Sequence, residues 1–448
     1  MLTRRQMLKR TLGGSSLLAL GSTVPGFVAS TARAAEMGKD QVLVVVELAG
    51  GNDGLNTVIP YADALYHEAR PTLGFKKKDV LRVDDSIGLH PALRPLESLL
   101  EDNQLAILQG VGYPNPNRSH FESMDIWQTA DPRRRLTNGW LGRTLGSVTV
   151  TEGGIPAFYV GNDKLPLALE GSATGVPSLH PEKPFEVQLS GKPERSDEDV
   201  AFNEPPTVKS ITPDGKSPPD ADAARRKLIR ELSALGSESP GTAGQFVRRT
   251  SLQTFTTIER LKKIMRDFHR PQGDYQVRGN RFQQVREGLE YELKLVSSMI
   301  QAGFGTRIYY VGIDGFDTHS DQASEHQRLL GTLANAVRSF YQELSASGDA
   351  SRVLLMTFSE FGRRVKENGS KGTDHGSGSC MFVAGPAARG GLIGKHPSLE
   401  ASALAAGDVR YHTDFRQVYA TLLDQWLGVD SRRVLNGEFD HVPLLKKA

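Results

Sequence analysis

Residues 41–48, Q-V-L-V-V-V-E-L, carry the strongest signal for the fold of this 448-residue chain. The run is almost entirely apolar and rich in β-branched residues, and it ends at Gly50-Gly51. Continuous runs of this kind are typical of strands that are buried on both faces, as in parallel sheets covered by helices. The sequence therefore predicts a central strand at 41–48 in an α/β protein.

Further strands and helices follow the same pattern along the chain. Four shorter apolar runs predict strands at 105–109, 306–311, 353–357 and 381–384. Apolar residues at intervals of three or four predict amphipathic helices within 252–268, 282–300 and 330–344. Because strands alternate with helices, we expect an α/β fold with a mostly parallel sheet and helices on both faces.

The first 35 residues have the order of a removable export signal. Arg4-Arg5 and Lys9 precede a mildly apolar stretch at 11–31, and small residues flank Arg33. This order is typical of a signal peptide, and the apolar part is too rich in Gly and Ser for a stable membrane span of ~20 apolar residues. We predict export to the periplasm or the extracellular space as a folded protein, with the twin-arginine translocase as a transient partner.

Residues 36–448 are predicted to form a single α/β domain that carries one surface insertion. The segment 190–245 holds seven prolines among charged and small residues, which is typical of a partly disordered excursion. The formal net charge of +2 gives no reason to expect a nucleic-acid partner. The single cysteine, Cys380, excludes an intramolecular disulfide.

Polar side chains stand next to every predicted strand, at the edge where open α/β sheets bind ligands. Carboxylates and imidazoles gathered there can hold a divalent cation or a phosphate-like anion. The alternative is ordinary turn chemistry, in which the same residues only form turns and cap helices. The candidates are Asp53 after the first strand, Arg118, Ser119 and His120 after the second, Asp317 and His319 after the third, Glu360 after the fourth, and Asp374 and His375 before the fifth.

The second of these loops offers catalytic groups. Ser119 precedes a predicted helix, and a hydroxyl at a helix N-terminus is well placed to attack a phosphorus. Arg118 could hold the anion, and His120 could bind metal or transfer protons. The competing interpretation is a helix-capping serine beside a surface arginine.

Five motifs, in chain order, resemble hallmarks of the bacterial family called domain of unknown function 1501. Members of that family commonly begin with a twin-arginine signal, and the activity of the family is not established. The resemblance covers nearly the whole chain after the signal. The motifs are A-G-G-N-D-G-L-N-T at 49–57, P-N-R-S-H-F at 116–121, G-F-D-T-H at 315–319, F-S-E-F-G-R-R at 358–364 and G-T-D-H-G at 372–376.

The order of elements is also similar, more distantly, to the alkaline phosphatase and sulfatase superfamily, which implies an alkaline-phosphatase-like sheet. Where that superfamily usually has Asp-His, this chain has Glu360-Phe361, and Asp374 is the candidate replacement ligand. A formylglycine sulfatase is excluded because Pro114 stands at the position of the modified residue. The roles that the resemblance implies are first metal ligand for Asp53, nucleophile for Ser119, middle ligands for Asp317 and His319, strand-end acid for Glu360 and last histidine for His375.

These observations predict an exported, metal-dependent hydrolase of phosphate or sulfate esters. The metal would be divalent (Zn, Mn or Ca), and the substrate a small-molecule or glycan ester. The alternative from another class is a non-catalytic exported protein that binds a cell-surface glycan or an assembly partner. A dinucleotide-dependent oxidoreductase is disfavoured, because Gly50, Gly51 and Gly54 lack the G-x-G-x-x-G spacing.

Overall fold

The computed structural model describes residues 40–148, 155–161, 164–172, 175–180, 261, 263–265, 268 and 288–446. The predicted signal at 1–35 and the predicted insertion at 190–245 lie outside the described residues, as does most of the predicted helix at 252–268. Those three assignments stay predictions.

One large sheet forms the centre of the described structure. Its strands follow the order β11-β5-β10-β9-β1-β8-β6-β7, and β12 pairs with β5. Their bounds are β1 Val42–Leu48, β5 Leu105–Gly112, β6 Ala157–Val160, β7 Ser178–Leu179, β8 Ile308–Ile313, β9 Val353–Phe358, β10 Ser379–Ala384, β11 Gly391–Ile393 and β12 Thr413–Asp414. A second, small sheet holds β2 Val58–Ile59, β3 Leu81–Arg82 and β4 Gly88–Leu89.

The large sheet is mostly parallel, as predicted. β1 pairs in parallel with both β8 and β9, whereas β10 is antiparallel to both β9 and β5. The direction of β10 determines at which edge of the sheet its preceding loop lies. The amino end of an antiparallel strand lies at the same edge as the carboxyl ends of its parallel neighbours, so the loop before β10 joins the loops that follow β1, β5, β8 and β9.

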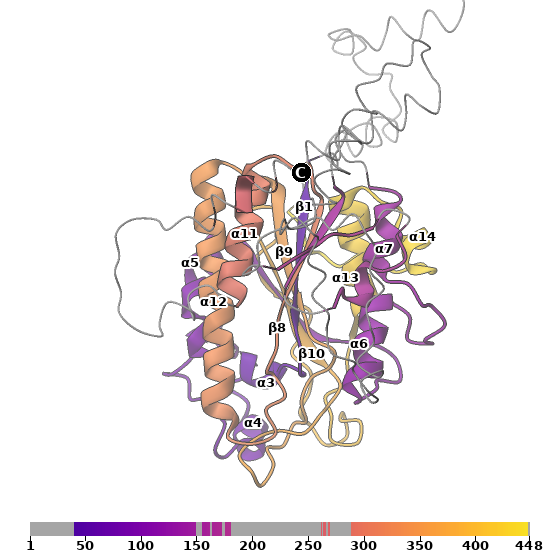
Figure 1. Ribbon diagram of the computed structural model, residues 1–448. Coiled ribbons are helices and arrows are strands. Elements are labelled where there is room, and N and C mark those ends of the chain that lie inside the picture. The colour runs from indigo at the N-terminus through magenta and orange to yellow at the C-terminus, as the bar shows by residue number, and fades with distance from the viewer. Residues whose placement is uncertain are drawn as a thin grey trace, which may run out of the picture.

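Helices cover both faces of this sheet (Figure 1), which confirms the predicted fold class. One face carries α5 Glu97–Glu101, α11 Leu289–Gln301, α12 Gln322–Ser347 and the 3-10 helix η2 Pro91–Leu96; the other carries α6 His120–Thr129, α7 Trp140–Leu145, α13 Phe415–Thr421 and α14 Ser431–Leu435. The remaining short elements are α3 Gly54–Thr57, α4 Ala64–Ala69, η3 Leu167–Leu169, η5 Ala350–Arg352 and η6 Leu422–Leu427.

Burial on both faces explains the apolar run at residues 42–46 of β1. Val44 and Val46 of β1 pack in the core under α11 and α12, and Leu43 and Val45 pack in the core on the opposite face. Each of these four side chains is 0% exposed. A strand between two helical layers therefore needs apolar residues at successive positions, and β1 has them.

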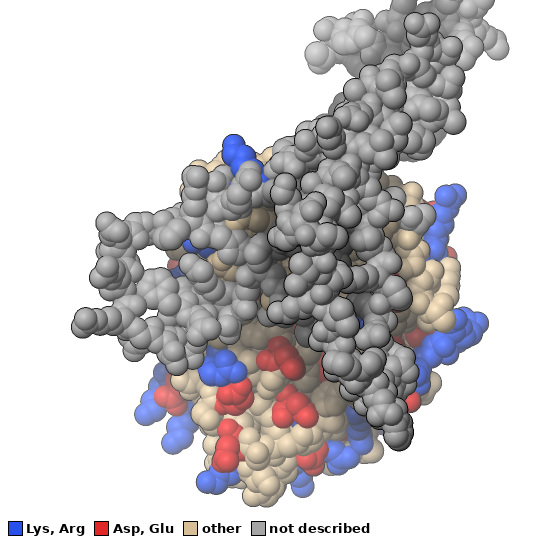
Figure 2. All heavy atoms as spheres, viewed as in Figure 1, with Lys and Arg blue, Asp and Glu red and all other residues tan. Residues whose placement is uncertain are grey.

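Charges of both signs are spread over the visible described surface (Figure 2), in keeping with the small net charge of +2. Asp and Glu gather near the middle of the lower half in this view, and Lys and Arg lie mostly around the outline. Among the helices of the described part of the chain, none is long and apolar enough to cross a membrane.

Candidate metal centre

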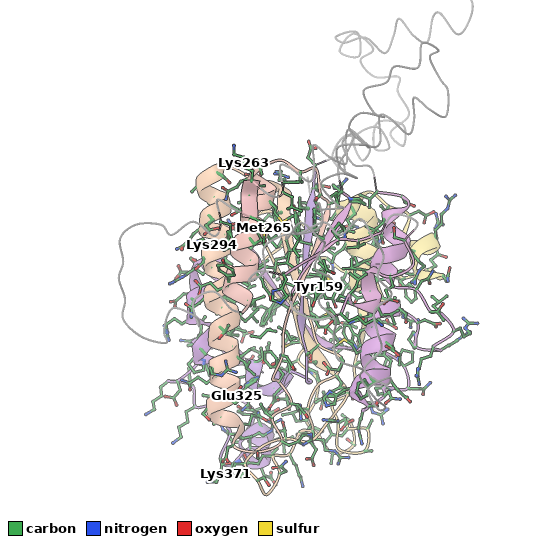
Figure 3. All side chains as sticks on the ribbon, in the orientation of Figure 1. Tyr159, Lys263, Met265, Lys294, Glu325 and Lys371 are labelled. Atoms are coloured by element: carbon green, nitrogen blue, oxygen red, sulfur yellow. The ribbon has the colours of Figure 1, made fainter. Side chains whose placement is uncertain are left out.

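The five polar loops predicted from the sequence meet at one edge of the sheet. The amide of Phe316 donates to the carbonyl of Ala49 over 3.0 Å, and the amide of Thr373 donates to the carbonyl of Thr318 over 3.1 Å. Figure 3 places Lys371 at this end of the molecule, far from Lys263 and Lys294. The loops after β1 and β8 and the loop before β10 are thus joined by backbone hydrogen bonds.

Glycine permits the closest of these approaches. Gly50 has a φ of +114°, and a Cβ at this position would lie 2.4 Å from the backbone nitrogen of Asp317. A side chain of any size would therefore push the loop after β1 away from the loop after β8. Glycine adopts such a positive φ without the steric cost that a Cβ would bring.

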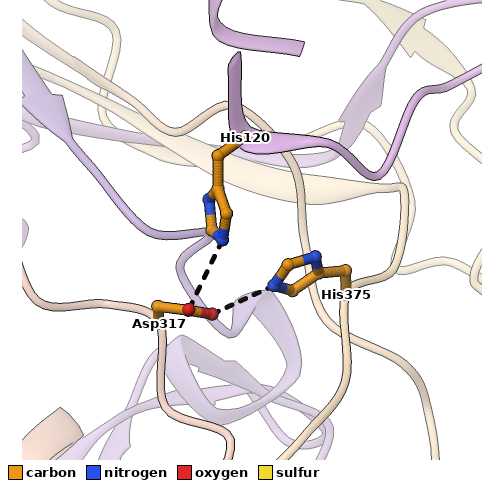
Figure 4. A group of neighbouring side chains, drawn as sticks. All are labelled: His120, Asp317 and His375. Carbon is orange, nitrogen blue, oxygen red and sulfur yellow. Dashed lines mark hydrogen bonds and ion pairs between the residues drawn. The ribbon is translucent and has the colours of Figure 1, made fainter. Parts of the chain in front are cut away.

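His120, Asp317 and His375 form the centre of the site (Figure 4). One ligand atom from each lies within 4.8 Å of the other two. Nε2 of His120 is 3.4 Å from Oδ2 of Asp317, and Nε2 of His375 is 3.0 Å from Oδ1 of the same carboxylate. Helix α6, the loop after β8 and the loop before β10 each supply one of these residues.

His319 adds a third imidazole to the same carboxylate. Its Nε2 lies 3.1 Å from Oδ1 of Asp317 and 2.9 Å from Nε2 of His375. Nitrogens of two rings therefore face each other across a short distance, beside an acid. Nitrogens so placed repel each other when both are deprotonated or both protonated, and a cation between such groups removes that repulsion.

Each of the three histidines makes a hydrogen bond through Nδ1. An oxygen atom accepts from this nitrogen in every case: Oε1 of Glu360 at 2.8 Å from His120, Oδ1 of Asp374 at 3.4 Å from His319, and the carbonyl of Arg118 at 2.8 Å from His375. An imidazole that donates from Nδ1 keeps a lone pair on Nε2. This arrangement is typical of metal-binding histidines and their supporting residues.

The electrostatics of the group favour a negative carboxylate. Burial acts to raise the pKa of Asp317, but the hydrogen bond from Arg363 and the positive charge of its guanidinium overcome this and lower the pKa to about 2. The hydrogen bond to Glu360 raises the pKa of His120 above its ordinary value. The centre therefore presents an ionised acid surrounded by imidazoles.

Glu360 lies behind the centre. Its side chain is 2% exposed, and Oε1 accepts both from His120 and from the amide of Gly50, the latter over 2.9 Å. Asp374 is 55% exposed and bonds to Asn368 and His319. Both predicted acids thus contact a histidine of the centre through its Nδ1 side.

Asp53 is not brought into this group. Its carboxylate is fully buried and accepts from both terminal nitrogens of Arg70, at 2.5 and 3.2 Å, and from the side chain of Gln322 at 2.5 Å. It also caps α3 through the amide of Asn56. Arg70 had no signal in the sequence, because it lies outside every motif and meets Asp53 only in the folded chain.

Ser119 occupies the N-cap position of α6, as predicted, but its hydroxyl makes no capping hydrogen bond. The residue is exposed and directly precedes His120. Arg118 does not point a free guanidinium at the centre, because Nη2 and Nε bind Oδ2 of Asp408 over 2.6 and 3.1 Å. Its contribution to the centre is the carbonyl that accepts from His375.

Arg363 is the second residue that reasoning from sequence did not place in the site. Its side chain is 0% exposed and donates to Oδ1 of Asp317 over 2.8 Å. The F-S-E-F-G-R-R motif showed two basic residues at this strand end, but the pattern does not tell which of them turns inward.

Residues 293–442 match the model of a family described as "Protein of unknown function (DUF1501)". The family resemblance is thereby confirmed over this part of the chain, which contains the motifs at 315–319, 358–364 and 372–376. A search of curated proteins finds no match to the chain.

Several solved structures are similar to this chain at low identity. A sulfatase from Pseudoalteromonas sp. is 12% identical with a TM-score of 0.39, over 93% of this chain and 74% of that one. A protein in the alkaline phosphatase superfamily from Vibrio parahaemolyticus is 10% identical with a TM-score of 0.32, over 89% and 69%. A phosphonate monoester hydrolase from Silicibacter pomeroyi is 10% identical with a TM-score of 0.32, over 89% and 75%.

Proposed function

We propose that this protein is a hydrolase of phosphate or sulfate esters that depends on a divalent metal held by His120, Asp317 and His375, with His319 beside them. The observation that carries the proposal is the set of three imidazoles whose Nδ1 atoms are engaged and whose Nε2 atoms approach or face Asp317. Imidazole nitrogens with one carboxylate oxygen are a donor set that suits Zn²⁺ and related ions.

The residues of the chain have distinct tasks in this proposal. A divalent metal bound there would polarise the ester and neutralise charge that develops on its oxygens. Ser119 is the proposed nucleophile, because its exposed side chain directly precedes the ligand His120. Glu360 and the carbonyl of Arg118 orient the imidazoles of His120 and His375.

Two substitutions test the proposal against aryl phosphate and aryl sulfate. His375→Ala should lose both bound metal and turnover. Ser119→Ala should lose turnover while its metal content and circular dichroism stay those of the unchanged protein. Ser351→Ala is the matched control, since Ser351 is also exposed but lies in η5, before β9, at the opposite edge of the sheet. Unchanged turnover in Ser119→Ala would reject this serine as nucleophile.

A non-catalytic function is the second candidate, and one observation favours it. Arg118, the cation predicted to hold an anion, is engaged by Asp408 instead. In that case the same edge would bind a glycan or an assembly partner without turning it over. Metal-loaded protein that hydrolyses neither ester, yet is stabilised against heat by a glycan, would support this second function over the first.

Export in the folded state is part of the proposal. A centre assembled from residues 120, 317 and 375, which lie in three separate segments, forms only after folding, so cytoplasmic metal loading would require folding before export. Replacing Arg4 and Arg5 together by Lys should leave a folded precursor in the cytoplasm. Normal export of that variant would reject the twin-arginine route.

A further inference from the structure

Two buried guanidinium groups lie among the loops at this edge of the sheet, one in contact with Asp317 of the candidate metal centre and one in contact with Asp53, and each is surrounded by oxygen atoms. The first belongs to Arg363, whose side chain is 0% exposed. It donates to Oδ1 of Asp317 and to backbone carbonyls in three loops. These carbonyls belong to Gly51 at 2.7 Å, Thr373 at 2.8 Å, Phe316 at 2.9 Å and Gly50.

The second guanidinium belongs to Arg70, and its surroundings are of the same kind. Both Arg70 and its partner Asp53 have side chains that are 0% exposed. Besides the two carboxylate oxygens of Asp53, Arg70 donates to the carbonyls of Val365 at 2.6 Å and Arg364 at 2.7 Å, and to Oδ1 of Asn56 at 3.3 Å.

Cages of carbonyl and carboxylate oxygens are the surroundings that hard cations such as Ca²⁺ take in proteins. Here a positive charge that belongs to the chain itself fills each cage. A second metal ion in either cage would have to displace a guanidinium, which would then be buried without its acceptors. Leaving one partner of a buried ion pair uncompensated is strongly unfavourable.

The cluster of three histidines differs from the two oxygen cages in its donor atoms and in having no guanidinium at its centre. Its donors are mainly nitrogens, and within the described part of the chain no Lys or Arg side chain hydrogen-bonds to Nε2 of His120, His319 or His375. Arg363 takes up Oδ1 of Asp317, while Oδ2 faces His120. The guanidinium of Arg363, which belongs to the chain itself, thus fixes the carboxylate of Asp317 in one orientation.

We infer that the centre binds a single divalent ion of the zinc class, because Arg70 and Arg363 act as permanent cations in the two oxygen cages. Arg363 is also the positioning residue for the ligand Asp317. This inference rests on the proposed function, since it specifies the metal at the same centre. It excludes a calcium-dependent or two-metal hydrolase.

Metal content of the purified, metal-stripped protein tests the stoichiometry and the selectivity. The protein is dialysed against equal concentrations of Zn²⁺, Mn²⁺, Ca²⁺ and Mg²⁺ and then analysed for bound elements. We expect one equivalent of zinc per chain, with calcium and magnesium at background. Two equivalents of any metal, or calcium in place of zinc, would overturn the inference but not the proposed function. No bound metal would overturn both.

Arg363→Ala tests the positioning role. We expect zinc affinity to fall about tenfold or more, as for other groups that orient a metal ligand. Guanidinium chloride at low millimolar concentration should restore it, and sodium chloride should not. Arg364→Ala removes the same charge one position further along and should keep zinc affinity. Wild-type zinc affinity in Arg363→Ala would overturn the positioning role, and if this variant does not fold, the stoichiometry still decides the inference.

Discussion

Glu47 carries the prediction that follows most directly from a single, largely buried carboxyl group. It is the last residue but one of the apolar strand β1, where it accepts hydrogen bonds from the hydroxyl of Tyr310 and, over 2.8 Å, from the side chain of Gln128. Burial raises the pKa of Glu47 from 4.5 to about 7, although these two hydrogen bonds oppose the rise; the nearby acids Glu360 and Asp314 add to it.

The sign and the magnitude of the effect on stability follow from the difference between the pKa of Glu47 in the folded protein and in the unfolded chain. Because the folded pKa lies above the unfolded one, the folded protein holds the proton more tightly. The resulting contribution to stability is fully present below pH 4.5 and is lost as the pH rises through 7. One unit of pKa corresponds to about 1.36 kcal/mol, so the whole loss is about 3 kcal/mol.

Replacing Glu47 by Gln removes the titration while keeping a side chain of the same shape. We expect Glu47→Gln and the unchanged protein to have similar free energies of unfolding at pH 4.5. At pH 8 the variant should be more stable by up to about 3 kcal/mol, from the difference in pKa. Urea denaturation followed by circular dichroism at both pH values measures this.

Glu325→Gln is the matched control for that experiment. Glu325 is a glutamate on α12 whose side chain is 43% exposed, and its hydrogen bond to Arg328 lowers its pKa. Its removal should therefore give no stabilisation at pH 8. The reasoning about Glu47 would be refuted if Glu47→Gln changed stability equally at pH 4.5 and pH 8, or if the unchanged protein were the more stable one at pH 8.

Three further predictions concern the loops at the candidate centre. Burial acts to raise the pKa of Asp53, but Arg70 lowers it to about 2. The pair should therefore add about 2 kcal/mol to the free energy of unfolding, and this contribution should be lost as the pH falls from 3.8 towards 2. Asp53→Asn should make the free energy of unfolding depend less on pH in that window, and an unchanged dependence would contradict the assignment. Glu360→Gln should weaken zinc binding by about 10–100-fold in a competition titration, with circular dichroism unchanged, because His120 loses its anionic acceptor. Gly50→Ala should lower the free energy of unfolding by about 1–3 kcal/mol more than Gly348→Ala, since both have positive φ but only Gly50 lies against backbone atoms; equal losses in urea denaturation would mean that the clash is absent.

The fold could be predicted because its main signals are local. The apolar run of β1 indicates a strand buried on both faces, and the period of 330–344 indicates the helix that the structure places within α12. The apolar runs do not indicate whether a strand is parallel or antiparallel to its neighbours. The predicted strand at 381–384 lies within β10, which is antiparallel, and nothing in an apolar segment distinguishes the two directions.

The candidate site could be predicted in its composition but not in its pairings. The sequence placed acids and histidines next to the strand ends, and the structure brings His120, Asp317, His319 and His375 to one point. Asp53 follows a strand in the same way, yet it lies against Arg70. The two aspartates differ only in what reaches them through space.

The sequence by itself therefore determined which segments become strands and helices, and which chemical groups stand at the edge of the sheet. Those properties depend on side chains a few positions apart. Only the folded structure brings imidazoles to Asp317 but not to Asp53, and only the folded structure places Glu47 against Tyr310 and Gln128. These properties depend on contacts made through space, over 17 residues of sequence between Asp53 and Arg70 and over 313 between Gly50 and Arg363, and on the water that such contacts exclude.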